Sequence, residues 1–185
     1  MVPALFLDRD GVINVDTGYL HRPEECRFVP GIFELVGAAN RAGYRVLIVT
    51  NQSGVGRGYF SEEVFRSFTE WMIGEFKRRG LSIDGVYFCP HHPDAPLDAY
   101  RVACACRKPE PGMFLSARDE FDVDMHRSIM VGDSRTDIEA AHAGGVGRAF
   151  LLVDPSQDGG LIDDCTVIHS LDEVLQALAD RTKSV

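Results

Sequence analysis

The sequence alternates short, almost wholly apolar runs with longer amphipathic segments, and this alternation restricts the possible folds more than any other feature. The apolar runs occupy residues 2–8, 44–50, 86–88, 128–133 and 148–153. Such runs are typical of strands in a parallel sheet that is covered on both faces. Amphipathic segments, which predict helices, occupy residues 31–42, 61–79, 112–121 and 136–143. Ser-Leu-Asp-Glu at 170–173 predicts the capped start of a last helix, so we expect an α/β protein with a mostly parallel sheet.

Composition and charge narrow the functional classes. The chain has 185 residues, 45% of them apolar and 25% charged, which fits one globular domain over residues 1–185. The net charge of −9 argues against a nucleic-acid surface, which needs clustered Lys and Arg. No apolar stretch approaches the roughly 18 residues of a membrane span. We expect a cytoplasmic monomer whose five cysteines are reduced thiols or metal ligands.

Polar residues end the first apolar run, where ligands of open α/β sheets bind. Asp8 and Asp10 stand two residues apart, and Gly11 lets the chain turn after them. Paired carboxylates commonly hold a divalent cation or divide the roles of nucleophile and acid. A capping turn with solvated acids is the simpler interpretation of this pair on its own.

Three later segments carry polar residues at comparable positions. Thr50 ends the second long run and begins Thr-Asn-Gln-Ser-Gly, in which Asn51, Gln52 and Ser53 suit contacts with phosphate oxygens. Lys108 supplies a positive charge, and Asp133 ends another run, with Asp137 four residues later. Separately, these residues fit a turn, a surface lysine and an acidic helix cap.

Together, in this order, they resemble the four motifs of the haloacid dehalogenase superfamily of phosphohydrolases. The resemblance implies a Rossmann-like three-layer sandwich in which Asp8 becomes an aspartyl phosphate. It implies that Asp10 protonates the leaving oxygen and then activates water, while Thr50 and Lys108 hold the transferring group. It also implies Mg²⁺ bound by Asp8, Asp133 and the backbone carbonyl of Asp10.

The spacing of these motifs leaves little room for a cap domain. A loop, a helix and a strand fill the chain between Asp8 and Thr50. Between Thr50 and Lys108 lie the helix of 61–79, the strand of 86–88 and a loop rich in Cys and His. We therefore expect a member without a cap, in which that loop forms part of the site wall.

The loop of residues 89–106 contains two close pairs of potential zinc ligands. Cys89 and His91 form one pair, and Cys104 and Cys106 form the other after twelve intervening residues. Three thiolates and one imidazole suit a closed, tetrahedral, structural Zn²⁺ site. A disulfide or unreactive thiols are the alternative, and His92 is a reserve ligand.

Two further cysteines lie outside the loop. We expect Cys26 and Cys165 to be ordinary buried thiols. Their positions give them no partner in the two ligand pairs.

From about Leu5 to Val146 the motifs resemble those of the zinc-containing D-glycero-D-manno-heptose 1,7-bisphosphate 7-phosphatases. The resemblance implies removal of the 7-phosphate in ADP-heptose and lipopolysaccharide precursor synthesis. It implies sugar-phosphate binding by the stretch Asp16, Thr17, Gly18 and Tyr19, and recognition by Arg107 beside Lys108. Ser134 stands where relatives often have a basic residue, which affects the expected binding of the distal phosphate. Val12 stands where members of the superfamily often have Thr.

Three alternatives are considered. Histidinol-phosphate phosphatase shares the core without a cap and a Cys/His zinc loop, although its loop is typically shorter. A receiver-type signalling domain also phosphorylates an Asp beside Mg²⁺, but it has no zinc loop. A zinc-based interaction module explains residues 89–106 and leaves the polar strand ends unexplained. Turnover of a phosphate monoester separates the enzyme from both non-enzymes.

Overall fold

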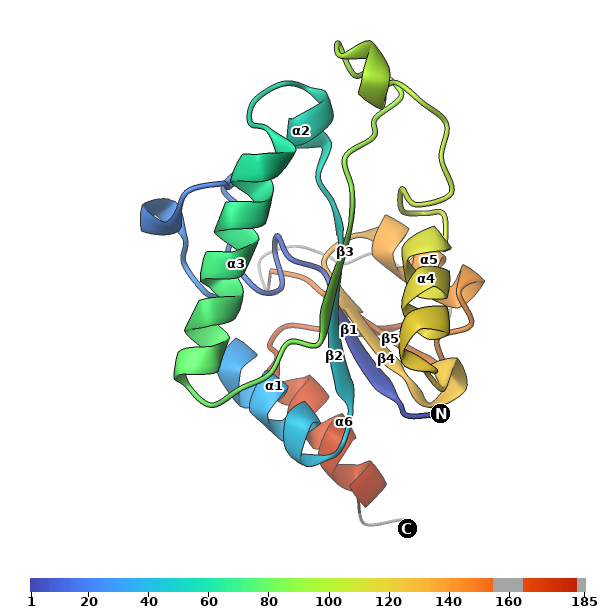
Figure 1. Cartoon of the computed structure of the whole chain (residues 1–185). Helices are drawn as coiled ribbons and strands as arrows, with labels where there is room; N and C mark the ends of the chain where they lie inside the picture. Colours follow the sequence, from blue (N-terminus) through green and yellow to red (C-terminus); the bar gives the residue numbers. More distant parts are fainter. Residues whose placement is uncertain (155–164, 183–185) are drawn as a thin grey trace.

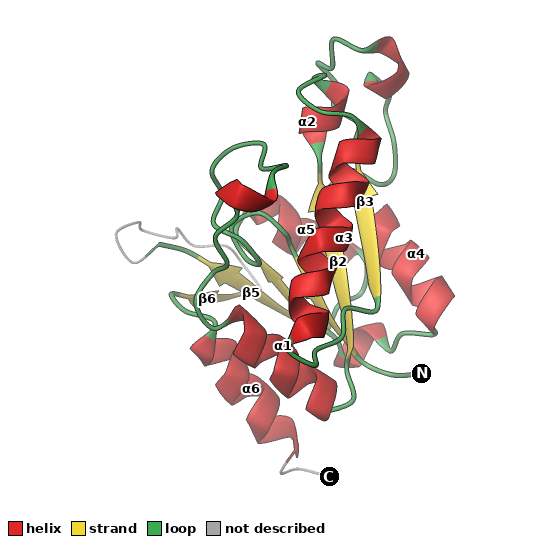
Figure 2. Cartoon of the chain, turned by 60° about the vertical axis from the view of Figure 1, so that its left-hand side comes forward, coloured by secondary structure: helices red, strands yellow, loops and turns green. Residues whose placement is uncertain are grey.

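The core of the molecule is a parallel sheet, seen in the computed structural model, which describes residues 1–154 and 165–182 (Figures 1 and 2). All five strand pairings within these residues are parallel, and the strand order is β3-β2-β1-β4-β5-β6. The strands are β1 Ala4–Leu7, β2 Arg45–Asn51, β3 Gly85–Cys89, β4 Ile129–Gly132, β5 Arg148–Leu152 and β6 Thr166–Ile168. The expected α/β class is confirmed, and the sheet is wholly rather than mostly parallel over these residues.

Helices cover both faces of this sheet and complete three layers. In Figure 1, α1, α3 and α6 lie on one side and α4 and α5 on the other. The helices are α1 Ile32–Arg41, α2 Ser53–Gly56, α3 Glu62–Arg78, α4 Gly112–Phe121, α5 Arg135–Ala143 and α6 Asp172–Thr182. Short 3-10 turns are η1 Pro23–Glu25, η2 Asp98–Tyr100 and η3 Met125–Arg127.

The first strand shows how one short apolar run serves two cores. Leu5 and Leu7 pack in the cluster on the α1, α3 and α6 side, and Ala4 and Phe6 pack in the cluster on the α4 and α5 side. All four are fully buried. Because successive strand side chains point to opposite faces, burial on both faces requires an unbroken apolar run. Each large side chain contributes about 1.5–3 kcal/mol by leaving water.

Every expected strand and helix is present, with ends shifted by at most two residues. The expected cap at residues 170–173 is partly formed, since the Glu173 carboxylate accepts from the backbone N–H groups of His169 (2.8 Å) and Ser170 (3.2 Å). β6, α2 and the 3-10 turns were not predicted from the sequence. They have three or four residues each, too few for a hydrophobic period to become visible.

In the described part of the chain, the two segments that could carry a cap hold short turns and helices and strands of the core sandwich. Residues 8–50 contain η1, α1 and most of β2, and residues 51–108 contain α2, α3, β3 and η2. None of the described helices is both long and apolar enough to cross a bilayer. The expected domain of residues 1–185 also includes 155–164 and 183–185, which lie outside the described residues.

Candidate active site

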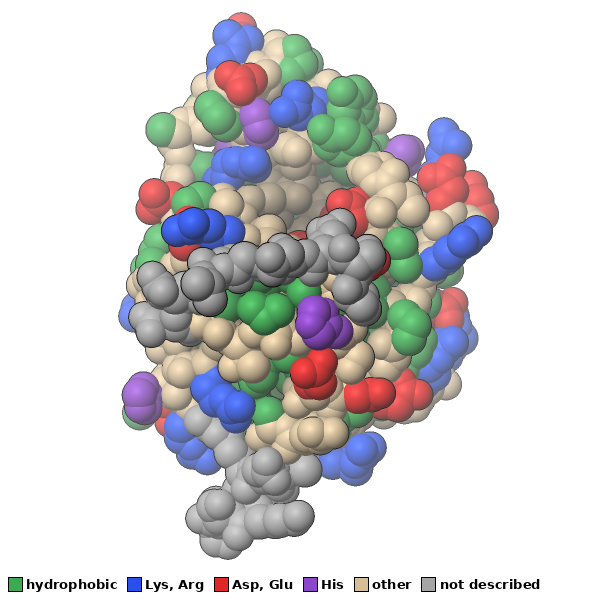
Figure 3. Space-filling view, turned by 180° about the vertical axis from the view of Figure 1, so that it is seen from behind, with side chains coloured by type: hydrophobic (Ala, Val, Ile, Leu, Met, Phe, Trp, Pro, Cys, Tyr) green, Lys and Arg blue, Asp and Glu red, His purple; other side chains and the backbone are tan. Residues whose placement is uncertain are grey.

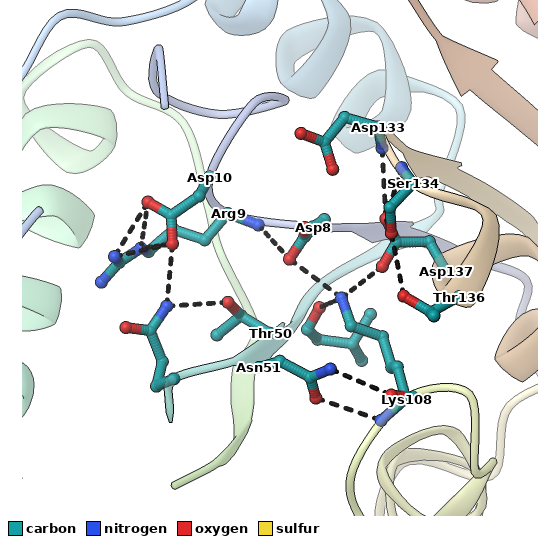
Figure 4. A network of polar contacts seen from close by, with 12 residues as sticks. Asp8, Arg9, Asp10, Thr50, Asn51, Lys108, Asp133, Ser134, Thr136 and Asp137 are labelled. Carbon is teal, nitrogen blue, oxygen red and sulfur yellow. Dashed lines mark hydrogen bonds and ion pairs between the residues drawn. The ribbon is translucent and has the colours of Figure 1, made fainter. Parts of the chain in front are cut away.

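The polar strand ends meet at the carboxyl edge of the sheet. β1 pairs with β2 on one side and with β4 on the other, so Asp8 lies between Thr50 and Asp133. The Asp8 N–H donates to the Val131 carbonyl (3.0 Å), which extends the β1–β4 ladder up to the carboxylate. β2 and β3 lie on one side of β1, whereas β4, β5 and β6 lie on the other. A crevice forms at the carboxyl edge of a sheet where the strand order reverses in this way. Figure 4 shows these residues around Lys108.

Lys108 lies at the centre of the site, where its ammonium group contacts two carboxylates and a backbone carbonyl. Its Nζ is 2.9 Å from Asp8 Oδ1 and 2.5 Å from Asp137 Oδ1, and it donates to the Val49 carbonyl at 2.8 Å. Lys108 is 3% exposed, so the cation is stable there because carboxylates surround it. Burial alone would lower the pKa of Lys108, but Asp8 and Asp137 raise it above its ordinary value. Lys108 therefore stays charged.

Burial has the opposite effect on the carboxylates. Burial, with the charges of Asp137 and Asp10, raises the pKa of Asp8 to about 7 against the lowering effect of Lys108. Asp133 is the exposed member of the three carboxylates. Desolvation by the surrounding protein, together with the charges of Asp8 and Asp137, nevertheless raises its pKa to about 8. Lys108 alone therefore does not offset the effects that raise the pKa of these two carboxyl groups.

The three carboxylates of Asp8, Asp133 and Asp137 can hold a metal ion. Their oxygen atoms lie within 4.8 Å of one another. Three ionised carboxylates and one ammonium leave two negative charges, which a divalent cation would balance. Hard oxygen donors of this kind suit Mg²⁺. A Cβ on Gly11 (φ +83°) would lie 1.9 Å from Asp133 Oδ2, so glycine is required where the turn approaches this carboxylate.

The role of Asp137 was missed in the sequence. The Asp133–Asp137 pair was counted as the fourth motif, with a helix cap as the alternative for the pair alone, but Asp137 was assigned no role in the site. In the structure Asp137 caps α5. Its Oδ2 accepts from the Ser134 N–H (3.0 Å) and hydroxyl (2.7 Å), while Oδ1 contacts Lys108. One carboxylate thus joins the start of α5 to the centre of the site. The Ser134 hydroxyl, expected to contact substrate, is engaged in this capping box; substrate contact by Ser134 stays a prediction.

Asp10 is turned toward a different set of partners. Its carboxylate accepts from Arg9, from Asn14 Nδ2 (3.0 Å) and from Gln52 Nε2 (2.9 Å). Gln52 Nε2 also donates to Thr50 Oγ1 (2.9 Å) and so links the expected acid to the phosphoryl-binding position. The Asp10 side chain is engaged by these partners, and the expected contact of its backbone carbonyl with Mg²⁺ stays a prediction.

Asn51 contacts the backbone of Lys108 from β2. Its Oδ1 accepts from the Lys108 N–H (3.0 Å), and its Nδ2 donates to the Lys108 carbonyl (3.1 Å). Asn51 was expected to bind substrate. The structure adds that it fixes the backbone that carries the central lysine.

A pocket of about 350 Å³ adjoins Asp10. Its lining comprises Asp10, Asp16, Gly18, Tyr19, Asn51, Gln52, Ser53 and Gly54. Six of the expected substrate-binding residues are thus brought together, whereas Thr17 is exposed and is not part of this lining. Asp16 accepts from the Gly18 N–H (2.8 Å), which shapes the turn. Seen from behind, the surface is hollowed between the upper loops and the body (Figure 3).

The four expected zinc ligands form a compact cluster at the end of β3, which Cys89 closes, and in the loop that follows. Cys89, Cys104 and Cys106 have Sγ···Sγ separations of 3.0, 3.4 and 3.6 Å, and His91 Nδ1 lies 3.4 and 3.6 Å from two of them. A tetrahedral zinc with 2.3 Å Zn–S bonds has sulfur atoms about 3.8 Å apart. A disulfide would need about 2.05 Å, and all five cysteines are free. The donor set therefore fits zinc.

The other cysteines and the reserve ligand lie elsewhere. His92 contacts Arg57 through Nε2 (3.2 Å) and accepts from the Asp94 N–H through Nδ1, so it is not part of the cluster. Cys26 and Cys165 were expected to be buried, and this is wrong, since both are only partly buried. Each packs at the edge of a core rather than inside it.

Comparison with known proteins agrees with this geometry. Residues 105–175 match the model of HAD-hydrolase-like proteins. The chain is 53% identical over 150 residues to D-glycero-beta-D-manno-heptose-1,7-bisphosphate 7-phosphatase of Vibrio cholerae, with 81% of each chain covered. It is 52% identical over 151 residues to the D-glycero-alpha-D-manno-heptose-1,7-bisphosphate 7-phosphatase of Burkholderia mallei, covering 82% of this chain and 80% of that one.

A solved structure extends the comparison to the fold. D,D-heptose 1,7-bisphosphate phosphatase from B. bronchiseptica, complexed with magnesium and phosphate, matches with a TM-score of 0.82 and 31% identity. The match covers 97% of this chain and 99% of that one. The sheet, the gathered strand ends and these relatives lead to one conclusion. The chain belongs to the family of D-glycero-D-manno-heptose-1,7-bisphosphate 7-phosphatases, phosphoric monoester hydrolases of the haloacid dehalogenase superfamily.

Proposed function

We propose that this protein removes the 7-phosphate of D-glycero-D-manno-heptose 1,7-bisphosphate through an aspartyl-phosphate intermediate. The observation that carries the proposal is the position of Asp8, a buried carboxylate bonded to Lys108 and grouped with Asp133 and Asp137 beside a pocket. Lys108 withdraws charge from one Asp8 oxygen and fixes its position. The same oxygen, Asp8 Oδ1, also accepts from the Arg9 backbone N–H (2.8 Å).

The reaction divides into two steps. Asp8 Oδ attacks phosphorus while the bond from phosphorus to the sugar oxygen breaks, and Asp10 donates a proton to that leaving oxygen. In the second step Asp10 takes a proton from water, the water oxygen attacks phosphorus, and the Asp8–phosphorus bond breaks. Thr50 and Lys108 would stabilise the charge on the phosphoryl oxygens throughout.

Two metal ions complete the proposal. Asp8, Asp133 and the Asp10 carbonyl would hold Mg²⁺, which would supply charge compensation for the carboxylates and the phosphoryl group. Asp137 lies in the same carboxylate group but is already bonded to Lys108 and Ser134. Cys89, His91, Cys104 and Cys106 would hold a structural Zn²⁺.

Recognition of the second phosphate is assigned to cations on the zinc loop side. Arg107 Nη1 donates to the His91 carbonyl (3.0 Å), so its guanidinium is tied to the metal cluster. Arg57 lies against His92, which is also near Arg107. In the described part of the chain, no carboxylate lies within ion-pair distance of either arginine. Guanidinium groups without an acidic partner suit a phosphate dianion.

Phosphate release from a substrate panel tests the proposed function. The panel contains both anomers of the heptose bisphosphate, fructose 1,6-bisphosphate and histidinol phosphate. Both anomers are needed because relatives named for each have nearly equal identity to this chain. We expect the highest kcat/KM for one heptose bisphosphate anomer, with product retaining the 1-phosphate. Preference for histidinol phosphate would overturn the substrate assignment and favour the alternative phosphatase.

A further inference from the structure

We propose that Arg9 is a positioning residue that orients Asp10 for acid–base catalysis. This inference rests on the catalytic role proposed for Asp10 and adds a residue to which neither the motifs nor the comparisons assign a function. Arg9 Nη2 lies 2.9 and 2.8 Å from the two Asp10 carboxylate oxygens, and Nε lies 3.1 Å from both. In Figure 4 the guanidinium meets Asp10 on the side away from Asp8.

The surroundings of Arg9 hold the guanidinium in one place. Arg9 is 1% exposed, and its Cζ lies 5.7 Å and 5.3 Å from the ring centroids of Phe65 and Phe68 on α3. Nη2 also donates to the Leu20 carbonyl (3.0 Å). A planar cation packed against two aromatic rings has few alternative orientations. Burial without a counter-charge would be costly, and Asp10 is its ion-pair partner within the described residues.

Through this contact the buried Arg9 side chain restricts the movement of the partly exposed Asp10 carboxylate. The Asp10 side chain is 22% exposed and lies at the boundary between the buried Arg9 and the pocket. A fork that contacts both oxygens fixes the plane of the carboxylate as well as its position. The Asn14 side-chain amide supports the same orientation by donating to Asp10 Oδ1. The Gln52 amide donates to both Asp10 Oδ2 and Thr50 Oγ1 and so connects these two residues. Asp10 can therefore meet the leaving oxygen without first losing rotational freedom.

The proposal makes a specific chemical prediction. A general acid matters most when the leaving oxygen is strongly basic, and least when it leaves as a stable anion. Disturbing Asp10 through Arg9 should therefore slow hydrolysis of alkyl phosphates more than hydrolysis of p-nitrophenyl phosphate. A merely structural role for Arg9 would slow both substrates by the same factor.

The test compares Arg9→Met and Arg9→Lys with the unchanged protein, all assayed with p-nitrophenyl phosphate, phenyl phosphate and an alkyl phosphate. We expect the loss in kcat/KM for Arg9→Met to be at least about 10-fold greater with the alkyl phosphate, part of the roughly 10²–10⁴-fold contribution of a general acid. Arg9→Lys keeps the charge without the fork and should give an intermediate loss. Arg66→Met removes an arginine that also has an ion pair and a ring contact, and it should leave all rates unchanged.

A double variant separates positioning from stability. Once Asp10→Asn is present, adding Arg9→Met should not change the dependence on leaving group any further. Equal losses on all three substrates, or a further change in the double variant, would overturn the proposal. If Arg9→Met does not fold, the same comparison with Arg9→Lys decides the question. Because these substrates are monophosphates, failure of the heptose bisphosphate assay would leave this result unaffected.

Discussion

The phosphoryl site and the Cys/His cluster are stabilised in different ways. Asp8, Thr50, Lys108 and Asp133 come from four distant segments and meet because neighbouring parallel strands end at one edge. The Cys/His cluster comes from one loop that follows the edge strand β3. The first site balances its charges with a buried lysine. In the second, burial and hydrogen bonding with the other thiols raise the pKa of Cys89 against the lowering effect of a backbone hydrogen bond at His91.

This difference indicates what each region needs in order to be organised. The sheet fixes the acids and Lys108 before any ligand arrives, so Mg²⁺ would be an exchangeable addition. The larger aliphatic side chains of the loop, Leu97 and Val102, are exposed, so its metal would supply folding free energy that burial does not. The two regions are connected because Cys106, a cluster member, is two residues before Lys108, and Arg107 lies between them. Five predictions examine this contrast.

The largest effect is expected from a change at the centre of the phosphoryl site. Asp8→Asn removes the proposed nucleophile while keeping nearly the same shape, so it should abolish turnover and leave the fold and the cluster intact. Steady-state rates, circular dichroism and zinc content check this expectation. Asp10→Asn is the matched variant and should lose roughly 10²–10⁴-fold in kcat. An Asp8→Asn protein with near wild-type kcat would end the covalent mechanism.

Chelation should separate the two metals. EDTA should stop turnover by removing Mg²⁺ from its hydrated, oxygen-lined site, and added Mg²⁺ should restore it. About one Zn²⁺ per chain should survive the same treatment and gel filtration, because three thiolates hold it. Elemental analysis beside the assay measures both results. Joint loss of zinc and activity that Mg²⁺ alone fails to restore would show that the regions are not independent.

Arg107→Ala tests whether the loop contributes to substrate choice. As a recognition group, Arg107 should contribute roughly 2–3 kcal/mol to kcat/KM for the bisphosphate, the order of a charged hydrogen bond. The loss should be much smaller for p-nitrophenyl phosphate, which has no second phosphate. Equal losses on the two substrates, fading in high salt, would instead indicate a general electrostatic effect.

Cys104→Ser tests the cluster itself. It should lower zinc content well below one per chain and reduce kcat/KM for the bisphosphate by no more than Arg107→Ala does, since it acts through the position of Arg107. Cys26→Ser, at a thiol outside the cluster, is the control and should keep its zinc. Full zinc content in Cys104→Ser would reject Cys104 as a ligand.

The smallest expected effect is a pH dependence of stability. Asp8 and Asp133 have folded-state pKa values of about 7 and about 8, above the ordinary 3.8, so the folded state binds their protons more tightly than the unfolded state does. Their contribution to stability is complete below pH 3.8 and is lost as pH rises through 7 and 8. The Tm in EDTA should therefore fall by a few degrees from pH 6 to 9, and Mg²⁺ should reduce that fall.

A control variant identifies the groups responsible. Asp8→Asn removes one of the two titrations, so its Tm in EDTA should depend less on pH over the same range. An equal dependence in the variant and the unchanged protein would assign the effect to other groups. Calorimetry at each pH supplies both values.

The sequence by itself determined the longer strands and helices of the described residues and the polar residues that end the strands, but not β6 or α2. Apolar runs such as residues 2–8 must be buried on both faces, and parallel strands place their carboxyl ends on one edge, so the gathering of Asp8, Thr50 and Asp133 could be predicted. The four cluster residues were also found, because both ligand pairs are local in sequence. These predictions succeeded since each depends on periodicity or on short spacing.

Only the tertiary structure decided which side chains contact each other within the site. Asp137 was counted in the fourth motif without a role of its own, and Arg9 was given no role, yet they contact Lys108 and Asp10. Asn51 also holds the Lys108 backbone, while its expected contact with substrate stays a prediction. A polar side chain has several possible partners, and the choice depends on rotamers and burial that arise when distant segments pack. Charge balance in the buried site then favours one arrangement, because an unpaired charge there would be costly.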